Sequence, residues 1–262
     1  MKRALAFSLL FLFAVCVNVN AQQQNNYIDF GLGLQIYHHE YEEPGLMKND
    51  GIFYGLSYSL FYENKFYFGL EGLASYGQVD YSSTSSGTLD NNDDICFDTR
   101  GILGYIILDD EKTKAMPYIG IAYRFLRDDS KNKLTSTSHL GYVRKSNYYY
   151  SPVGIRLTLD ITKGWSLNPE IEYDYFWSGK QESDLGYVAG YEDIENDQDN
   201  GYGYRLSIAL NKKAKNLTFG FRLFYRYWDI DESDITRDSL GRSWVEPAND
   251  TSEYGMDFSL FF

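Results

Sequence analysis

Charged side chains recur at alternate positions within apolar or small-residue stretches of this 262-residue chain. A period of two is typical of a β-strand, so the charges of several strands would share one face of a sheet. Ion pairing is the chemistry this face could perform, because the planar guanidinium of arginine binds carboxylates with two hydrogen bonds. The predicted members are Arg100, Arg124, Arg156, Arg205, Arg222, Arg226, Asp29, Glu71, Asp98, Glu170, Glu172, Asp174 and Asp257.

Two interpretations of the charged face are open: a plug of ion pairs that fills a narrow barrel, or a lining that selects solutes. Enclosed charges must be paired, because a lone buried ion costs several kcal/mol. Open aqueous channels belong to barrels of about 16 or more strands. We therefore expect the plug, with Phe176, Phe224 and Trp228 on the same face helping to block the bore.

Hydrolytic chemistry would need a general base, and the three histidines are His38, His39 and His139. We expect all three at the bases of loops, where His139 with Asp128 or Asp129 is a conceivable pair. No nucleophile, base and orienting group converge in the sequence, and neither zinc spacing nor a phosphate-binding glycine loop occurs. We expect no catalytic residues, no metal site and no cofactor.

The segment 182–199 contains seven acidic residues and neither Lys nor Arg. Carboxylate oxygens bind Ca²⁺, but the spacing is not that of an EF-hand loop. The plainer interpretation is a solvated loop surface. Divalent cations that bridge it to phosphate groups are the alternative.

Ten stretches with alternating apolar residues must position these side chains. The connections between them alternate long and short, and 38–50 and 82–93 are predicted to be polar loops. Eight or twelve strands are alternatives if one of the less regular segments, 66–81 or 142–161, is misassigned. The predicted strands are 27–37, 52–60, 66–81, 95–108, 119–125, 142–161, 165–177, 202–210, 217–227 and 250–262.

The apolar face of these strands is expected to contact lipid. Aromatic residues make up 18% of the chain, and the other face consists mainly of Gly, Ser and Ala with charges of both signs. An unpaired apolar strand such as 250–262 would aggregate at the edge of a soluble sheet, whereas a membrane barrel pairs its edges. The net charge of −13 disfavours nucleic acid as a partner.

Residues 1–21 have the features of a signal peptide: Lys2 and Arg3, an apolar stretch too short to span a membrane, and small residues before cleavage at Ala21. Cys16 raises a lipoprotein alternative, which the bulky Val15 disfavours. The mature chain, 22–262, is expected to be one barrel domain. Its single cysteine, Cys96, cannot form an internal disulfide.

An exported chain of alternating strands ending Tyr254-Gly255-Met256-Asp257-Phe258-Ser259-Leu260-Phe261-Phe262 resembles the small single-chain outer-membrane β-barrel proteins of Gram-negative bacteria. The resemblance covers 25–262 and implies an all-β fold, a transmembrane antiparallel up-and-down barrel of about ten strands in the cell outer membrane. It implies that Tyr254, Phe258, Leu260 and Phe262 act as a signal for the barrel-assembly machinery. Outer-membrane lipids and lipopolysaccharide are the other expected partners, and a monomer is expected.

This group includes structural proteins, adhesins, narrow channels, proteases and lipid-modifying enzymes, so the fold does not select among them. The barrel proteases use an Asp-His pair on the fourth long loop, and 179–200 contains no His. The barrel deacylases and phospholipases use a His followed shortly by a Ser, whereas Leu140 and Gly141 follow His139. We expect a non-enzymatic structural or surface-exposed role with acidic extracellular loops. A narrow solute channel is the first alternative, and a barrel protease or lipid hydrolase is the second.

Overall fold

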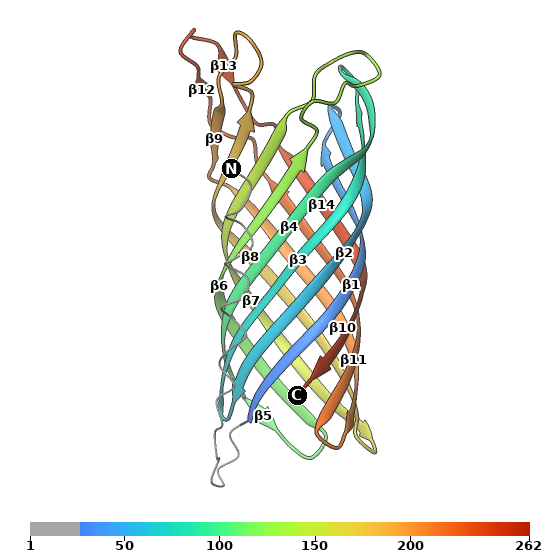
Figure 1. The fold of residues 1–262 in the computed structure, drawn as a ribbon. Coiled ribbons are helices and arrows are strands. Elements are labelled where there is room, and N and C mark those ends of the chain that lie inside the picture. Colours follow the sequence, from blue (N-terminus) through green and yellow to red (C-terminus); the bar gives the residue numbers. More distant parts are fainter. Residues whose placement is uncertain (1–26) are drawn as a thin grey trace, which may run out of the picture.

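The alternating strands close into one antiparallel barrel (Figure 1). The computed structural model describes residues 27–262, and the predicted signal peptide, 1–21, lies outside the described residues. Each strand pairs with the next along the chain, and β14 pairs with β1 to close the ring. This confirms the predicted ten-stranded barrel. Its wall strands are β1 (Tyr27–Glu43), β2 (Met47–Glu63), β3 (Phe66–Ser83), β4 (Gly87–Tyr105), β6 (Thr113–Asp129), β7 (Val143–Thr162), β8 (Trp165–Asp184), β10 (Gly201–Ala214), β11 (Leu217–Ile230) and β14 (Asn249–Phe261).

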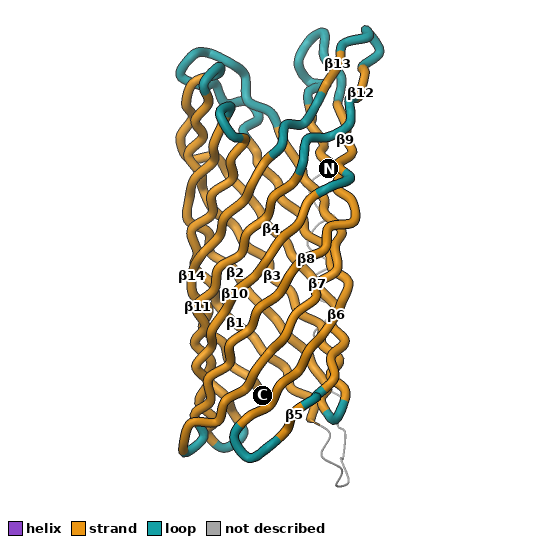
Figure 2. The backbone as a smooth tube through the Cα atoms, turned by 180° about the vertical axis from the view of Figure 1, so that it is seen from behind, coloured by secondary structure: helices purple, strands orange, loops and turns teal. Residues whose placement is uncertain are grey.

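The two ends of the barrel differ in their connections (Figure 2). One end has tight turns at 64–65, 163–164 and 215–216, and there β5 (Leu108–Asp109) pairs with the start of β6. The other end carries the loops 130–142, 185–200 and 231–248, which include β9 (Ile194–Gln198), β12 (Thr236–Arg237) and β13 (Ser243–Trp244). Outer-membrane barrels have short periplasmic turns and longer extracellular loops, so the β5 end is the periplasmic end. Within 27–262, no helix is long and apolar enough to cross a membrane.

Two of the predicted extracellular loops are strand instead. Most of 38–50 and 82–93 extends the β1–β2 and β3–β4 hairpins, which turn at 44–46 and 84–86. Gly45 at the first turn has a φ of 77°, which favours glycine over other residues. The prediction that 38–50 and 82–93 are polar loops is therefore wrong. Backbone pairing continues beyond the membrane, where an apolar outer face is no longer required.

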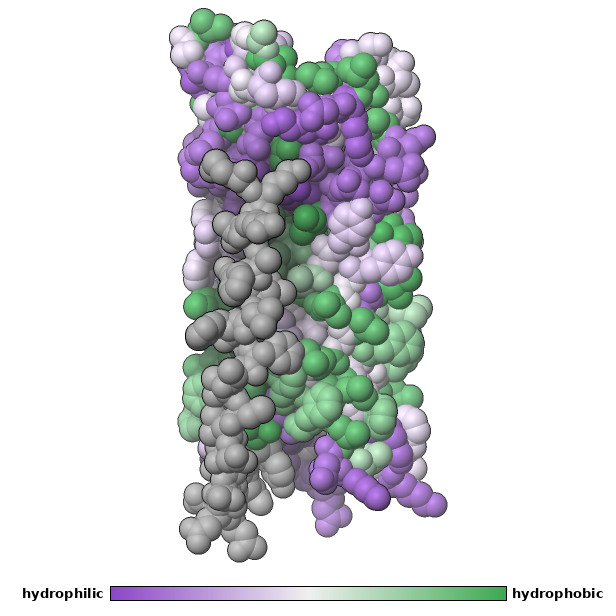
Figure 3. Space-filling model, in the orientation of Figure 1, coloured by the Kyte–Doolittle hydropathy of each residue, from purple (hydrophilic) through white to green (hydrophobic). Residues whose placement is uncertain are grey.

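The outer surface carries a broad band of exposed apolar side chains (Figure 3). Leu34 is 63% exposed, Leu56 is 65% exposed and Ile121 is 64% exposed. Soluble monomers rarely expose contiguous apolar patches larger than a few hundred Å². A continuous band between two polar ends is the lipid-contacting surface of a transmembrane barrel. The polar surface above the band belongs to the extended strands and loops of the extracellular end.

Aromatic side chains fill much of the upper lumen. Trp228, Tyr148, Tyr150 and Phe176 form one buried cluster with Ala122 and Ile230. A second cluster consists of Tyr37, Phe53, Leu73, Val79 and Cys96, and Phe224 packs against it. The expectation that Phe176, Phe224 and Trp228 point inward is therefore confirmed.

Candidate functional site: a charged network in the lumen

The predicted charged face lines the inside of the barrel. Every residue of the predicted set except Asp29 makes an ion pair there. Asp29 lines a cavity of about 340 Å³ towards the periplasmic end of the lumen, here called the periplasmic cavity, and has no ion pair within 4 Å among the described residues. Period-two strands place these side chains inward, because their neighbours on each strand face lipid.

Arg100 and Arg156 connect three glutamates in the lower part of the network. The Nη1 atom of Arg100 lies 2.5 Å from Glu172 Oε1, and its Nη2 atom lies 2.7 Å from Glu71 Oε2. Arg156 Nη2 lies 3.1 Å from the other oxygen of Glu71, and its Nε atom lies 2.9 Å from Glu170 Oε2. Each guanidinium therefore bridges two carboxylates that come from different strands.

Arg205 extends the network upward. Its Nη2 atom lies 2.8 Å from Asp98 Oδ2, and its Nε atom lies 2.9 Å from Asp174 Oδ2. The hydroxyl of Tyr150 lies 3.1 Å from both oxygens of Asp98. The charged network is thus continuous with the first aromatic cluster.

Glu253 is the centre of the upper part and was absent from the predicted set. It is fully buried, and its carboxylate accepts a hydrogen bond from Arg124 Nη2 at 2.8 Å. Arg226 Nε forms an ion pair with it at 2.8 Å, and His39 Nδ1 lies 2.9 Å away. Glu253 lies two residues before Gly255 and four before Asp257 on the same face of the final strand. The period-two pattern of this strand therefore predicts that Glu253 faces the lumen.

The charges of this network nearly balance. Six arginines face seven paired carboxylates, and a buried charge without a partner would be strongly destabilising. The paired carboxylates are those of Glu71, Asp98, Glu170, Glu172, Asp174, Glu253 and Asp257.

A cavity of about 340 Å³ lies below the upper part of the network. Its lining extends from Glu63 and Asn211, near the periplasmic turns, to Arg226 and Phe224. Glu63 pairs with Lys114 at the lower end. A separate cavity of about 30 Å³ lies at the extracellular end. Fully buried side chains, among them Arg124 and Trp228, lie between the two levels.

A third set of charges lies at the extracellular mouth. Arg144 Nη2 lies 2.5 Å from Glu43 Oε1 and also pairs with Glu246, while its guanidinium stands over the ring of Tyr41. Burial raises the pKa of Glu246, which lies in the loop before β14, and the charge of Arg144 opposes this rise. Arg144 therefore holds two carboxylates together at the rim.

The histidines do not occupy the predicted positions at loop bases, except for His139. His39 is buried in the lumen and faces Glu253, and His38 lies on the outer face of β1. His139 lies in the loop 130–142, and its Nδ1 atom is 2.9 Å from the Thr137 hydroxyl. The conceivable partners of His139 contact other groups: Asp128 accepts from Asn49, and Asp129 pairs with Arg127. The prediction was wrong for His38 and His39 because β1 continues past them.

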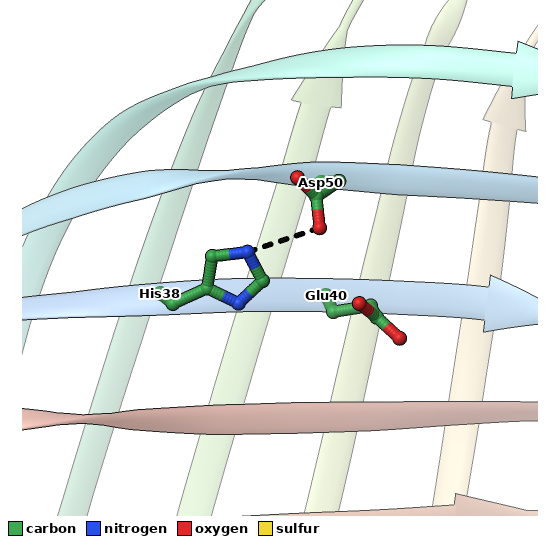
Figure 4. Close-up of side chains that lie close together, drawn as sticks. All are labelled: His38, Glu40 and Asp50. Atoms are coloured by element: carbon green, nitrogen blue, oxygen red, sulfur yellow. Dashed lines mark ion pairs between the residues drawn. The ribbon is translucent and has the colours of Figure 1, made fainter.

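His38, Glu40 and Asp50 form a group whose ligand atoms lie within 4.8 Å of one another (Figure 4). His38 Nε2 lies 3.0 Å from Asp50 Oδ2. The ammonium of Lys48 lies 2.7 Å from Glu40 and 3.9 Å from Asp50. Lys48 already supplies a positive charge to Glu40 and Asp50, so this group does not require a bound cation.

The acidic side chains of the segment 182–199 contact several different groups. Lys145 pairs with Glu182 and Asp184, and Lys180 pairs with Glu195. The Asp193 carboxylate accepts from the backbone N–H of Gly186. These contacts favour the interpretation of 182–199 as a solvated loop surface.

No protein-family model matches the chain, and no curated protein matches it. Among solved structures, the outer-membrane protease OmpT from Escherichia coli aligns with a TM-score of 0.63 at 9% identity, over 93% of this chain and 99% of that chain. The transport unit of the autotransporter AIDA-I from Escherichia coli aligns at 0.40 and 9% identity, over 95% and 93% of the two chains. The Pseudomonas putida toluene transporter TodX aligns at 0.37 and 9% identity, over 91% and 90%. The likeness to OmpT concerns the fold alone. The chain has the fold of the bacterial outer-membrane β-barrel proteins, as its closing strand predicted.

Proposed function

We propose that this protein is a closed, non-enzymatic outer-membrane barrel with a structural or surface-exposed role. The observation that carries the proposal is the ion pair between Arg124 and Glu253. Arg124 is on β6 and Glu253 is on β14, and these strands are five positions apart in the ring of ten. The pair therefore spans the full width of the bore.

The obstruction at this level has several layers. Arg226 and His39 bind the same carboxylate, and the Arg124 guanidinium stands 5.9 Å from the centre of the Trp228 ring. A solute that passed this level would have to separate buried ion pairs, and each separated charge would lose its compensation. This argument supports the plug over a narrow solute channel.

The placement of the histidines supports a non-enzymatic role. His39 is 1% exposed and directed at Glu253, so a substrate cannot reach it without opening the network. His38 faces outward and is bound to Asp50, and His139 is bound to Thr137. A general base must lie within hydrogen-bond reach of the proton that it takes.

The proposal extends to the partners. Both edges of β14 are paired, with β1 and β11, so the wall offers no free strand to a second copy, which supports a monomer. Tyr254, Phe258 and Phe262 point outward and are each more than half exposed, and Leu260 lies on the same face. They are available to outer-membrane lipids and to the barrel-assembly machinery. Lipopolysaccharide would meet the outer leaflet side of the apolar band.

Single-molecule recording in planar bilayers tests the closed bore. We expect no stepwise conductance from the refolded wild-type barrel. The double variant Arg124→Ala, Trp228→Ala removes two obstructing side chains and should give brief openings, while Ile121→Ala, on the lipid face of the same strand β6, should stay silent. Steady steps from wild type would support the channel instead. Peptide or ester hydrolysis that is lost in His139→Ala would support the enzyme.

A further inference from the structure

Two aspartates face each other at the extracellular end of the lumen. Asp94 of β4 and Asp128 of β6 are register partners in the antiparallel ladder. Both line the cavity of about 30 Å³ at that end. Like charges directly opposite each other across a strand pair are destabilising. The pair therefore requires compensation by a positive charge.

The neighbouring basic side chains are committed to other groups. Arg144 lines the same cavity, but its guanidinium binds Glu43 and Glu246. Lys133 Nζ donates to the carbonyl oxygen of Asn91 at 2.7 Å. Within 27–262, neither Asp94 nor Asp128 has a basic group within 4 Å. Counting Glu43 and Glu246 with the two aspartates, four carboxylates surround one guanidinium, and the ammonium of Lys133 is the next basic group.

Three buried oxygen atoms point to a ligand at this position. Asn49 of β2 is 3% exposed and donates its Nδ2 group to Asp128 Oδ2 at 3.0 Å. The Oδ1 atoms of Asn49, Asp94 and Asp128 are all buried without a hydrogen-bond partner. All three residues line the small cavity. Buried acceptors are normally satisfied, so three unpartnered oxygens around one cavity call for an electropositive occupant.

We propose that Asn49, Asp94 and Asp128 form a binding site for one Ca²⁺ ion. Ca²⁺ is coordinated by about six to eight carboxylate, carbonyl and water oxygens in flexible geometry. Mg²⁺ requires nearly regular octahedral coordination and loses its bound waters less readily. A cavity of about 30 Å³ accommodates the ion with one or two waters. The ion neutralises the aspartate pair and connects β2 to β4 and β6, which stiffens the extracellular rim.

The test uses the full refolded barrel in detergent after treatment with EDTA. Titration with CaCl₂, followed by calorimetry and by thermal unfolding, should show saturable binding and a rise of several degrees in Tm. MgCl₂ should give a smaller rise. Asp94→Asn should abolish both calcium responses, and its Tm in EDTA should equal or exceed that of the wild type because the like-charge repulsion is gone. Asp50→Asn, at the outer His38 group, should keep both responses.

Terbium provides a second readout if Asp94→Asn does not fold. Tyr41 lines the same cavity and should sensitise Tb³⁺ luminescence in wild type, and Asp128→Asn or Asn49→Ala should remove the signal. The proposal is overturned if wild type shows no calcium response at millimolar concentration, or if Asp50→Asn abolishes the response while Asp94→Asn retains it. A proton shared by the two aspartates is the competing form of compensation. It would give a Tm in EDTA that falls as pH rises, with no effect of calcium.

Discussion

Arg124 and Glu253 form an ion pair across the full bore, with 2.8 Å between Arg124 Nη2 and Glu253 Oε1. Both side chains are fully buried, and their strands, β6 and β14, lie on opposite walls of the barrel. The interior of the barrel therefore combines a buried ion-pair network with the aromatic clusters packed around it.

Replacing Glu253 with Gln should destabilise the barrel strongly. The change leaves Arg226 without a negative partner and leaves Arg124 only the more distant Asp98, at 3.9 Å. Breaking a buried pair in this way costs about 3–5 kcal/mol. Urea unfolding in lipid vesicles measures the loss. Glu182→Gln is the matched control, since Glu182 is a part-exposed partner of Lys145 and should cost less than about 1 kcal/mol. Equal losses in the two variants would contradict the role given to Glu253.

Gly255→Ala should destabilise the contact between β14 and β1. An added methyl group would meet the backbone oxygen of Ile36 and the Cα and Cβ atoms of Tyr37, which cannot move without displacing the strand. Overpacking of this kind costs about 1–3 kcal/mol. Gly101→Ala is the control, because nothing lies within 4 Å of the methyl position there. Its unfolding free energy should change by less than about 1 kcal/mol. A neutral Gly255→Ala variant would contradict the close approach of the two strands.

The loop that carries β12 and β13 should loosen in acid. Asp238 accepts hydrogen bonds from the backbone N–H groups of Leu240 and Arg242 and from Trp244 Nε1. Burial would raise the pKa of Asp238, but the hydrogen bonds from Trp244 and Arg242 outweigh it and lower the pKa to about 2.

Because the pKa is lower in the folded loop, the stabilisation is present above about pH 4 and is lost as the pH falls towards 2. Amide exchange in 231–248 should therefore accelerate over this interval relative to exchange in the barrel strands. Asp238→Asn should show fast exchange already at neutral pH. Slow exchange in that variant would mean that the carboxylate does not hold the loop.

The strand pattern was predictable where one face of a strand touches lipid. The apolar residues from Ile28 to Ile36 and from Tyr254 to Phe262 alternate with small or polar residues. The first segment lies in β1, and the second lies in β14 up to Phe261. The signal stops at His38 and at Ser82, because above the membrane the outward face of a strand is no longer apolar. Backbone pairing continues there, although apolar and polar residues no longer alternate. β1 and β2 are therefore longer than the strands predicted from the sequence.

The charged set was predictable as a face but not as a network. Alternation places Arg124 and Arg226 inside, yet their common partner depends on which strands oppose each other in the closed ring. The cation site proposed at Asn49, Asp94 and Asp128 departs from the expectation of no metal site for the same reason. These residues lie on three different strands, and Asn49 fell within a segment predicted to be a loop.

The central claim is that the apolar face contacts lipid while the charged face is enclosed. Its most direct measurement is the accessibility of a nitroxide label at the neighbouring positions Leu56→Cys and Ser57→Cys, in a background in which buried Cys96 is replaced by Ser. Leu56 points outward, and Ser57 lines the periplasmic cavity. In lipid vesicles the label at 56 should collide with oxygen and be shielded from a water-soluble nickel complex, and the label at 57 should be less accessible to oxygen than the label at 56. A label at 56 that meets the nickel complex as freely as one placed at exposed Asp80 would contradict the membrane-spanning barrel.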